Sequence, residues 1–178
     1  LYNQEYECSF DSAVVGAIFG EEIQKAREDG RIGEFPYRRE LPVYTFWDLG
    51  WGDATAIWFA QKVGEYWHVI DYYENNNKDL PHYVGVLNAR GYSYKEDWIP
   101  HDGAHGNRQT GVSDDDMLLR LGRFPRVMQR TKTKNDSINA ARSMFSRLRF
   151  DSAKCHDGID ALTNYRWDYN DELGVSSR

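Results

Sequence analysis

The sequence predicts a mixed α/β fold, in which a sheet of antiparallel and parallel strands is flanked by helices. Three observations favour this class. The first half of the chain holds aromatic and β-branched runs that end at glycines or asparagines, as short strands do. From residue 80 onward, helical spacing alternates with short apolar runs, which is typical of parallel strands joined by helices. The 178 residues, 40% of them apolar, suit one domain with a proper core.

The first half of the chain predicts one helix followed by an antiparallel meander. Residues 11–29 have helical apolar spacing, Gly30 is a stop signal, and residues 30–41 form a linker rich in Gly, Pro and charge. Two glycines and the Gly64-Glu65 pair mark tight turns between the strands. The expected strands are 43–48, 54–62 and 66–73.

The second half predicts helices that alternate with short strands. The expected helices are 80–90, which Gly91 ends, 113–121, 136–148 and 156–167. The expected strands are 98–101, 124–129 and 148–151, the last at an edge of the sheet. The order gives a mixed sheet whose first three strands are antiparallel and whose later strands are parallel.

Composition limits the function and the setting of the chain. No apolar run is long enough to cross a membrane, and no signal peptide is visible. Cys8 and Cys155 lie far apart without a C-x-x-C motif, which indicates reduced thiols and a cytosolic setting.

The net charge of −6 taken alone disfavours nucleic acid as a partner, but the charge is unevenly distributed. Residues 120–149 hold nine Arg or Lys side chains against one acid, Asp136. A basic zone beside acidic clusters suits a metal-dependent nuclease, which needs cations for phosphate and carboxylates for metal. The residues of this kind expected to contact DNA phosphates are Arg108, Arg130, Lys132, Lys134 and Arg142. The alternative is a solvated basic face, the usual fate of a charge run.

Two carboxylates follow short apolar strands and are the first candidates for a metal site. Asp48 ends the aromatic run 43–48, where a lone buried carboxylate would be costly, so a cation should lie near it. Asp53 in the following turn could face the same ion. Asp102 ends another apolar run, and it meets Asp48 if the two strands are parallel neighbours. The alternative for Asp102 is turn chemistry, because Asp-Gly is a common turn pair.

Two further acids begin the last predicted helix. Asp157 and Asp160 are three residues apart and share a helix face. A favourable interaction with the helix dipole would explain Asp157 well and Asp160 less well, since Asp160 lies among apolar residues. Together these carboxylates could supply oxygen ligands to two Mg²⁺ or Mn²⁺ ions roughly 4 Å apart. Asp71 and the run 114–116 are interpreted as structural, the latter as a solvated helix start.

Three segments together resemble the C-terminal nuclease domain of tailed-phage terminase large subunits. They are Phe46-Trp47-Asp48-Leu49-Gly50 with Asp53-Ala54-Thr55-Ala56, then Ile99-Pro100-His101-Asp102-Gly103, then His156-Asp157-Gly158-Ile159-Asp160-Ala161-Leu162. Their order and spacing match over residues 43–167. The resemblance implies an RNase H-like fold and a metal-dependent endonuclease that cuts concatemeric double-stranded viral DNA during packaging, with Mg²⁺ or Mn²⁺.

The resemblance also implies roles for individual residues. It makes Asp48, Asp102 and Asp160 the catalytic metal ligands, with Asp157 and Asp53 as further ligands. It implies little sequence preference, because nothing in the chain suggests a groove-reading helix.

The same resemblance implies how the chain is organised and where it acts. Residues 1–40 look like the end of a preceding ATPase domain with its linker, 41–170 like the nuclease domain, and 171–178 like a polar tail. The implied partners are double-stranded DNA and, in the full-length protein, an N-terminal packaging ATPase domain, the small terminase subunit and the portal. The isolated domain is expected to be monomeric and to act in the cytoplasm of the host bacterium.

Two other classes of function stay open on the sequence alone. The first hairpin carries Asp-x-Gly before a Thr, as in nucleotide-binding half-domains of the actin and sugar-kinase type, although that machinery needs a second domain of similar size. A non-catalytic DNA-docking module would also account for the basic zone.

Overall fold

The fold is described from a computed structural model that covers residues 16–50, 54–104, 111–166, 169–170 and 175–176. The helices are α1 (Gly20–Glu28), α2 (Leu80–Arg90), α3 (Asp114–Arg120), α4 (Lys134–Phe145) and α5 (His156–Asn164), and a 3-10 turn, η1, spans His101–Ala104. The strands are β1 (Ile32–Gly33), β2 (Val43–Asp48), β3 (Thr55–Val63), β4 (Tyr66–Asn75), β5 (Tyr94–Ile99), β6 (Pro125–Val127), β7 (Leu148–Asp151), β8 (Tyr169–Asn170) and β9 (Val175–Ser176).

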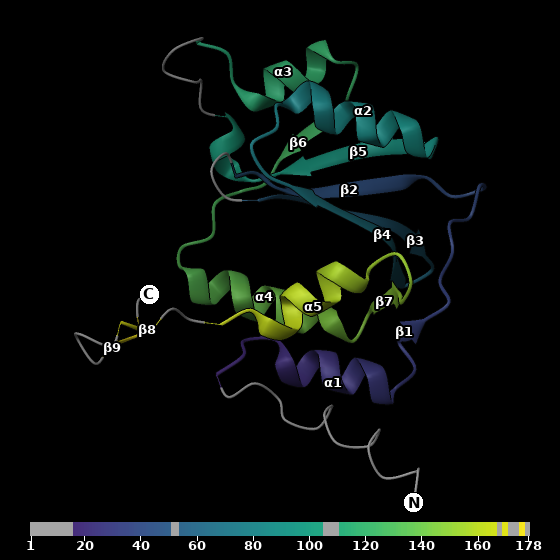
Figure 1. Ribbon diagram of the computed structural model, residues 1–178, viewed down its shortest axis with the longest axis vertical. Coiled ribbons are helices and arrows are strands. Elements are labelled where there is room, and N and C mark those ends of the chain that lie inside the picture. The colour runs from purple at the N-terminus through teal and green to yellow at the C-terminus, as the bar shows by residue number, and fades with distance from the viewer. Residues whose placement is uncertain (1–15, 51–53, 105–110, 167–168, 171–174, 177–178) are drawn as a thin grey trace, which may run out of the picture.

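A seven-stranded sheet in the order β1-β7-β4-β3-β2-β5-β6 forms the middle layer of the molecule. Helices α2 and α3 cover one face of this sheet, and α1, α4 and α5 cover the other (Figure 1). The meander β2-β3-β4 is antiparallel, whereas β5, β6 and β7 join it in parallel pairs. The predicted mixed sheet flanked by helices is therefore confirmed, and so is the parallel pairing of β2 with β5.

Strand alternation divides the core between the two faces of the sheet. Trp47, Ile57 and Phe59 point toward α2 and α3, and Phe46 and Trp58 point toward α4 and α5. Both sets are buried or half-buried, which explains why β2 and β3 read as almost continuous apolar runs. No helix in the described part of the chain is long and apolar enough to cross a membrane.

The strand predicted at 98–101 differs from the observed one at both ends. β5 begins at Tyr94 and ends at Ile99, and the chain then turns into η1. Pro100 lacks the N–H that would continue the ladder, so pairing ends there. As a result Asp102 lies on a 3-10 turn one step beyond the sheet instead of at the end of the strand.

The predicted edge strand 148–151 is instead an interior strand, and this corrects the sequence interpretation. β7 lies between β4 and β1, and β1 comes from the segment 30–41 that was expected to be a linker. Helix α1 packs against α4 and α5, with Ile23 and Ala26 almost fully buried. Residues 18–33 thus form part of the same core as the sheet, although the sequence assigned them to a preceding segment.

Several helix boundaries also move, and α4 ends at Phe145 instead of residue 148. The predicted helix 11–29 begins only at Gly20 within the described residues, because Gly16 has a φ of +89° and the Ile18 N–H is bonded to the Tyr165 carbonyl at 2.7 Å. Helix α4 begins at Lys134, two residues earlier than predicted, because Thr133 caps it in a capping box with Asp136. Helix α5 ends at Asn164, three residues earlier than predicted.

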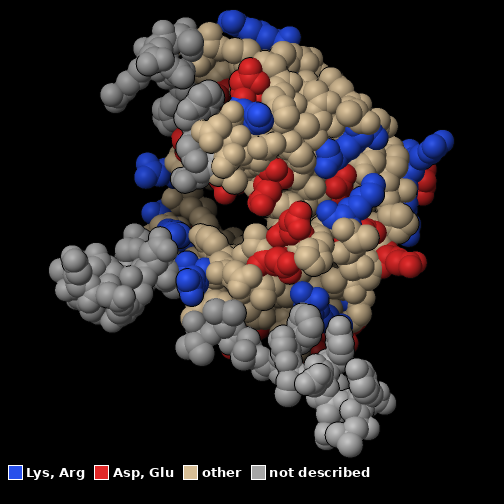
Figure 2. All heavy atoms as spheres, in the orientation of Figure 1, with Lys and Arg blue, Asp and Glu red and all other residues tan. Residues whose placement is uncertain are grey.

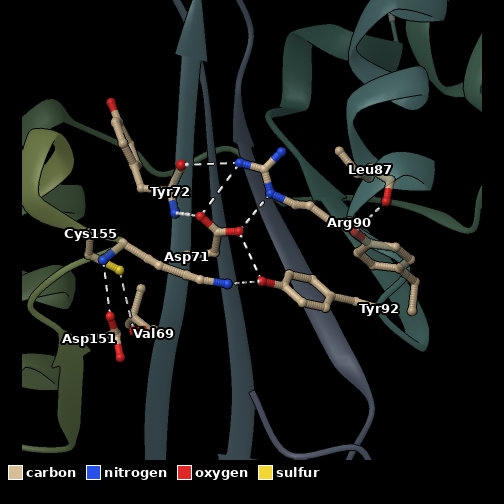
Figure 3. A network of polar contacts seen from close by, with 10 residues as sticks. Val69, Asp71, Tyr72, Leu87, Arg90, Tyr92, Asp151 and Cys155 are labelled. Atoms are coloured by element: carbon tan, nitrogen blue, oxygen red, sulfur yellow. Dashed lines mark hydrogen bonds and ion pairs between the residues drawn. The ribbon is translucent and has the colours of Figure 1, made fainter. Parts of the chain in front are cut away.

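A polar network around the buried Asp71 carboxylate ties β4 to the end of α2 and to the turn before α5 (Figure 3). The Asp71 carboxylate accepts a hydrogen bond from Arg90 Nε at 2.6 Å and one from the Tyr92 hydroxyl at 3.0 Å. Lys154 in turn donates to the Tyr92 hydroxyl at 2.9 Å. Asp71 is therefore a structural residue, as the sequence predicted.

Candidate metal centre

Asp48 lies at the end of β2 on the face that α4 and α5 cover. In the strand register Asp48 is opposite Ala56, and Ala56 is opposite Glu74 on β4. These three side chains therefore project from the same face in one row across the end of the sheet. Ala56 is small, so the two carboxylates stand on either side of a shallow floor. Strand alternation alone could not predict Glu74, since its place in the row depends on which strands pair.

Asp102 comes close to Asp48 because their strands are parallel neighbours. The turn η1 packs against Ile99 and against Leu49, the residue that follows Asp48: a Cβ added to Gly103 would lie 3.0 Å from Ile99 Cδ1 and 3.4 Å from Leu49 Cδ1. The hairpin on the other side is fixed by the Thr55 hydroxyl, which donates to the Gly50 carbonyl at 2.7 Å. These two turns therefore hold Asp48 and Asp102 at the same end of the neighbouring strands β2 and β5.

Several carboxylates lie close together at this end of the strands, and two of them have a raised pKa. Partial loss of hydration raises the pKa of the Asp48 carboxyl, and the Asp102 carboxylate raises it further. The pKa of Asp114, at the start of α3, is likewise raised by partial burial and then by Asp102 and Asp115. The sequence interpretation of 114–116 as a solvated helix start therefore missed Asp114 as a neighbour of Asp102.

The first turn of α5 carries the third group of acids. His156 Nδ1 lies 3.3 Å from Asp157 Oδ1 and 3.5 Å from Asp160 Oδ2, so this histidine links the two carboxylates. Both acids are largely exposed, with side-chain exposures of 81% for Asp157 and 53% for Asp160. The i, i+3 spacing puts both acids on one face of α5, as predicted, and this face is exposed.

Tyr72 lies on the floor of the site, on the same strand as Glu74. Its hydroxyl donates to Glu74 Oε2 at 2.6 Å. Burial and this bond raise the pKa of the Tyr72 phenol, and the charges of Asp157 and Asp48 both contribute to the rise. Among the α5 acids, only Asp157 contributes to this rise, and Asp160 does not.

A groove of about 370 Å³ opens beside Asp48, between the sheet and helices α4 and α5. Ala56, Trp58 and Tyr72 of the sheet form its floor, and Lys134 of α4 also lines it. Figure 2 shows a hollow at the middle of the molecule, with acidic and basic side chains on opposite margins. The groove therefore has a carboxylate, Asp48, and a cation, Lys134, in its lining.

The basic residues predicted to contact DNA fall into two groups, those exposed near α4 and one that holds the fold together. Arg130 and Lys132 are exposed in the segment that leads into α4, and Lys134 begins the helix. Arg142 instead holds α1, with an ion pair to Glu22 at 3.0 Å and a hydrogen bond to the Ile18 carbonyl at 2.6 Å. These contacts give it a structural role that the sequence did not predict.

Other predicted positions are either buried or lie outside the described residues. Arg123, part of the basic zone 120–149, is 7% exposed and paired with Asp97 at 2.6 Å, so it cannot contribute to a surface for DNA. Asp53 and Arg108 lie outside the residues that the structure describes, and their roles stay predictions.

The carboxylates of Asp48 and Asp102 are ligands that suit a hard divalent cation. Asp48 and Asp102 offer only oxygen donors, which Mg²⁺ and Mn²⁺ prefer, and a cation between them would relieve the repulsion that raises the pKa of Asp48. Within residues 16–50, 54–104 and 111–166, no group of three or more His, Cys, Asp or Glu side chains is arranged to hold a metal ion. The sheet pair therefore fits one side of a metal site, and the predicted convergence with Asp160 stays a prediction.

An antiparallel meander joined to parallel strands, with acids at the end of β2, on the turn η1 that follows β5, and on α5, is the arrangement expected of an RNase H-like domain. Residues 46–176 match the family of terminase RNaseH-like domains, and the chain belongs to this family. Among curated protein sequences none matches the chain. The resemblance that the three sequence segments suggested is thus confirmed at the level of family and fold.

Solved structures of terminases share this fold. A large terminase from a thermophilic bacteriophage, solved in complex with ATP-gamma-S, superposes with a TM-score of 0.63 at 16% identity over 91% of this chain and 41% of that one. The P22 large terminase nuclease domain gives a TM-score of 0.58 at 13% identity, covering 84% and 80% of the two chains.

The large terminase nuclease of the thermophilic phage G20c, with bound cobalt, gives a TM-score of 0.58 at 14% identity, covering 91% and 86%. The G20c nuclease has also been solved with magnesium and with zinc. The chain spans about two fifths of the length of the large terminase that was solved with ATP-gamma-S.

Proposed function

We propose that this chain is the nuclease domain of a large terminase and hydrolyses phosphodiester bonds in double-stranded DNA with little sequence preference. The observation that carries the proposal is the proximity of Asp48, at the end of β2, to Asp102, on the turn after the parallel strand β5, beside a groove bounded by α5. Membership of the terminase RNaseH-like family supports it, and so does the shared fold with terminase nucleases.

The residues that would hold the metal are Asp48 and Asp102 from the sheet, Asp160 and Asp157 from α5, and Asp53 from the hairpin turn. We expect two ions, Mg²⁺ or Mn²⁺. Such ions, when bound, supply charge neutralisation and lower the pKa of a coordinated water. The protein itself contributes ionised carboxylates at fixed strand ends, and a groove in which the scissile phosphate can lie beside them.

Basic side chains would position the DNA backbone. Lys134 lines the same groove as Asp48, and Arg130 and Lys132 are exposed on the segment leading to it. Arg108 follows the Asp102 turn in sequence. Such contacts fix the backbone without reading bases, which agrees with cleavage of low sequence preference.

The proposal extends to the setting of the whole protein. In a full-length large terminase this domain would follow a packaging ATPase and act with the small terminase subunit and the portal on concatemeric viral DNA. It would do so in the cytoplasm of the infected bacterium, and the isolated domain would be a monomer.

A plasmid-nicking assay with Mn²⁺, Mg²⁺ or EDTA tests the proposal. The wild-type protein should nick with either ion and not with EDTA, and Asp48→Asn should fall to the EDTA level. Glu40→Gln is the matched control, since it removes an exposed carboxylate at the opposite end of β2 and should nick like wild type. Nicking by Asp48→Asn at the wild-type rate would exclude the proposal. DNA binding without nicking under any condition would indicate a docking module, and ATP turnover a kinase-like half-domain.

A further inference from the structure

Gly158, in the first turn of α5, lies too close to the sheet for any side chain to fit between them. A Cβ placed on Gly158 would lie 2.4 Å from Trp58 Cη2 and 2.7 Å from Tyr72 Cδ2. Contacts below 3.0 Å require something to shift, and these atoms belong to packed aromatic rings whose centroids are 4.4 Å apart. The helix can therefore rest on the Trp58–Tyr72 floor only because residue 158 has no side chain.

The same helical turn is anchored to the sheet just before Gly158. The Cys155 thiol, which is fully buried, donates to the Val69 carbonyl at 3.3 Å, and the Cys155 N–H donates to the Asp151 carbonyl at 3.0 Å (Figure 3). One end of α5 is thus fixed by Cys155. The contact at Gly158, one turn further on, then sets how closely the helix approaches β4.

The acids of α5 stand directly beside this contact. Asp157 precedes Gly158, Asp160 follows two residues later, and the Asp157 charge reaches the Tyr72 phenol on which Gly158 rests. Tyr72 is itself held by its bond to Glu74, in the same row as Asp48. A change in the distance between α5 and the sheet would therefore move Asp157 and Asp160 relative to Asp48.

We propose that Gly158 is a positioning residue: its missing side chain seats α5 on Trp58 and Tyr72 at the height from which the helix acids reach the metal held by Asp48. This inference deepens the proposed nuclease function and rests on it. It assigns Gly158 no contact with metal or substrate.

A second helical glycine, Gly85, has room for a side chain and offers a comparison with Gly158. Gly85 lies within α2, and a Cβ there would meet nothing within 4 Å. Alanine is a better helix former than glycine, so both helices gain locally from a Gly→Ala change. Of these two positions, only Gly158 combines the gain with a collision, which makes Gly85→Ala a matched control.

The test compares Gly158→Ala with Gly85→Ala and wild type in thermal unfolding, Mn²⁺ binding by titration, and plasmid nicking. Gly85→Ala should bind Mn²⁺ like wild type. Gly158→Ala should bind Mn²⁺ about tenfold more weakly per folded molecule, and its nicking should fall in parallel at low Mn²⁺ and recover in part at high Mn²⁺. A purely structural role would lower the unfolding temperature and leave the Mn²⁺ affinity of the folded protein unchanged, which would overturn the inference.

Trp58→Leu alters the sheet side of the same contact and provides the test if Gly158→Ala does not fold. Removing the ring beneath Gly158 should also weaken Mn²⁺ binding several-fold, and unchanged binding by this variant would overturn the inference. If wild type itself neither binds Mn²⁺ nor nicks DNA, the proposed function is wrong and this inference falls with it. If wild type binds Mn²⁺ and nicks DNA, and Gly158→Ala and Trp58→Leu do so equally well, only the inference about Gly158 is wrong.

Discussion

Asp48 is a carboxylate that the fold holds in an unfavourable electrostatic position. Its strand brings it into a groove where it loses hydration, and the parallel neighbour brings Asp102 toward it. Both effects disfavour the ionised form, so neither stabilises the metal-free protein. A residue of this kind is typical of a site that binds a cation.

The raised pKa of Asp48 gives a prediction with a definite sign. Because the folded pKa lies above the ordinary value of 3.8, ionised Asp48 opposes folding, and this penalty grows as pH rises from about 3.8 through the folded pKa. Asp48→Asn should therefore raise the unfolding temperature of the metal-free protein at neutral pH, and the gain should vanish in acid. Thermal unfolding measured between pH 3.5 and 8 checks this.

Added Mn²⁺ should invert the order of stability. Wild type gains binding free energy from the ion, whereas Asp48→Asn has lost a ligand and should gain little. Glu40→Gln should follow wild type in both conditions. An Asp48→Asn protein less stable than wild type without metal would show that Asp48 has a favourable partner in the folded state.

At the same scale, local pattern could predict some site residues and not others. Asp48 and Asp102 each follow an apolar run that is visible in the sequence. Glu74 and Asp114 enter the region only through strand register and through the packing of α3 near η1, which depend on residues far away in the chain. Arg142 shows the converse, since its charge fits a DNA surface and its contacts with α1 are invisible in sequence.

At the scale of elements, the helices and strands with strong local signals could be predicted, and those that tertiary contacts create could not. The helix 80–90 was predicted to the residue with Gly91 as its stop signal, and the structure adds that Asp79 caps its start and that Gly91 has a φ of +65°. β1 has two residues and exists only because β7 pairs with it. The edge position expected for 148–151 was wrong for the same reason, since β1 covers that edge.

The join between α3, β5 and β6 depends on one buried ion pair. Asp97 is fully buried, and its carboxylate contacts Arg123 Nη2 at 2.6 Å and the Thr45 hydroxyl at 2.5 Å. Arg123 also stacks over the Tyr94 ring, with its Cζ 4.4 Å from the centroid. Arg123→Leu would leave a buried carboxylate without its cation and should destabilise the fold by about 3 kcal/mol or more. Urea unfolding measures the loss.

Arg126 offers the matched control for that change. It lies three residues further on, is 62% exposed, and pairs with Glu96 at 3.4 Å. Since exposed ion pairs contribute about 0–1 kcal/mol, Arg126→Leu should unfold close to wild type. Equal losses for the two variants would contradict the view that burial of the pair decides its importance.

For the whole molecule, the charge distribution decides how DNA can bind. The chain carries a net charge of −6, and its acids gather beside the proposed DNA path. We therefore expect the attraction to come from a local set of cations that includes the exposed Arg130, Lys132 and Lys134, and from divalent ions that neutralise the acids near Asp48. Binding without divalent ions should be weak and strongly dependent on salt.

Salt dependence provides a quantitative check on that path. Each phosphate contact adds about 0.9 to the slope of log affinity against log salt concentration, because neutralising a phosphate releases bound counterions. The double variant Lys132→Gln/Lys134→Gln should therefore lower the slope by about 1.8, when DNA binding is measured with Ca²⁺ in place of a catalytic ion. Lys62→Gln changes an exposed cation at the opposite end of β3 and should leave the slope unchanged. If both variants give the same slope, the DNA does not follow the start of α4, and the cations that hold it lie elsewhere on the domain.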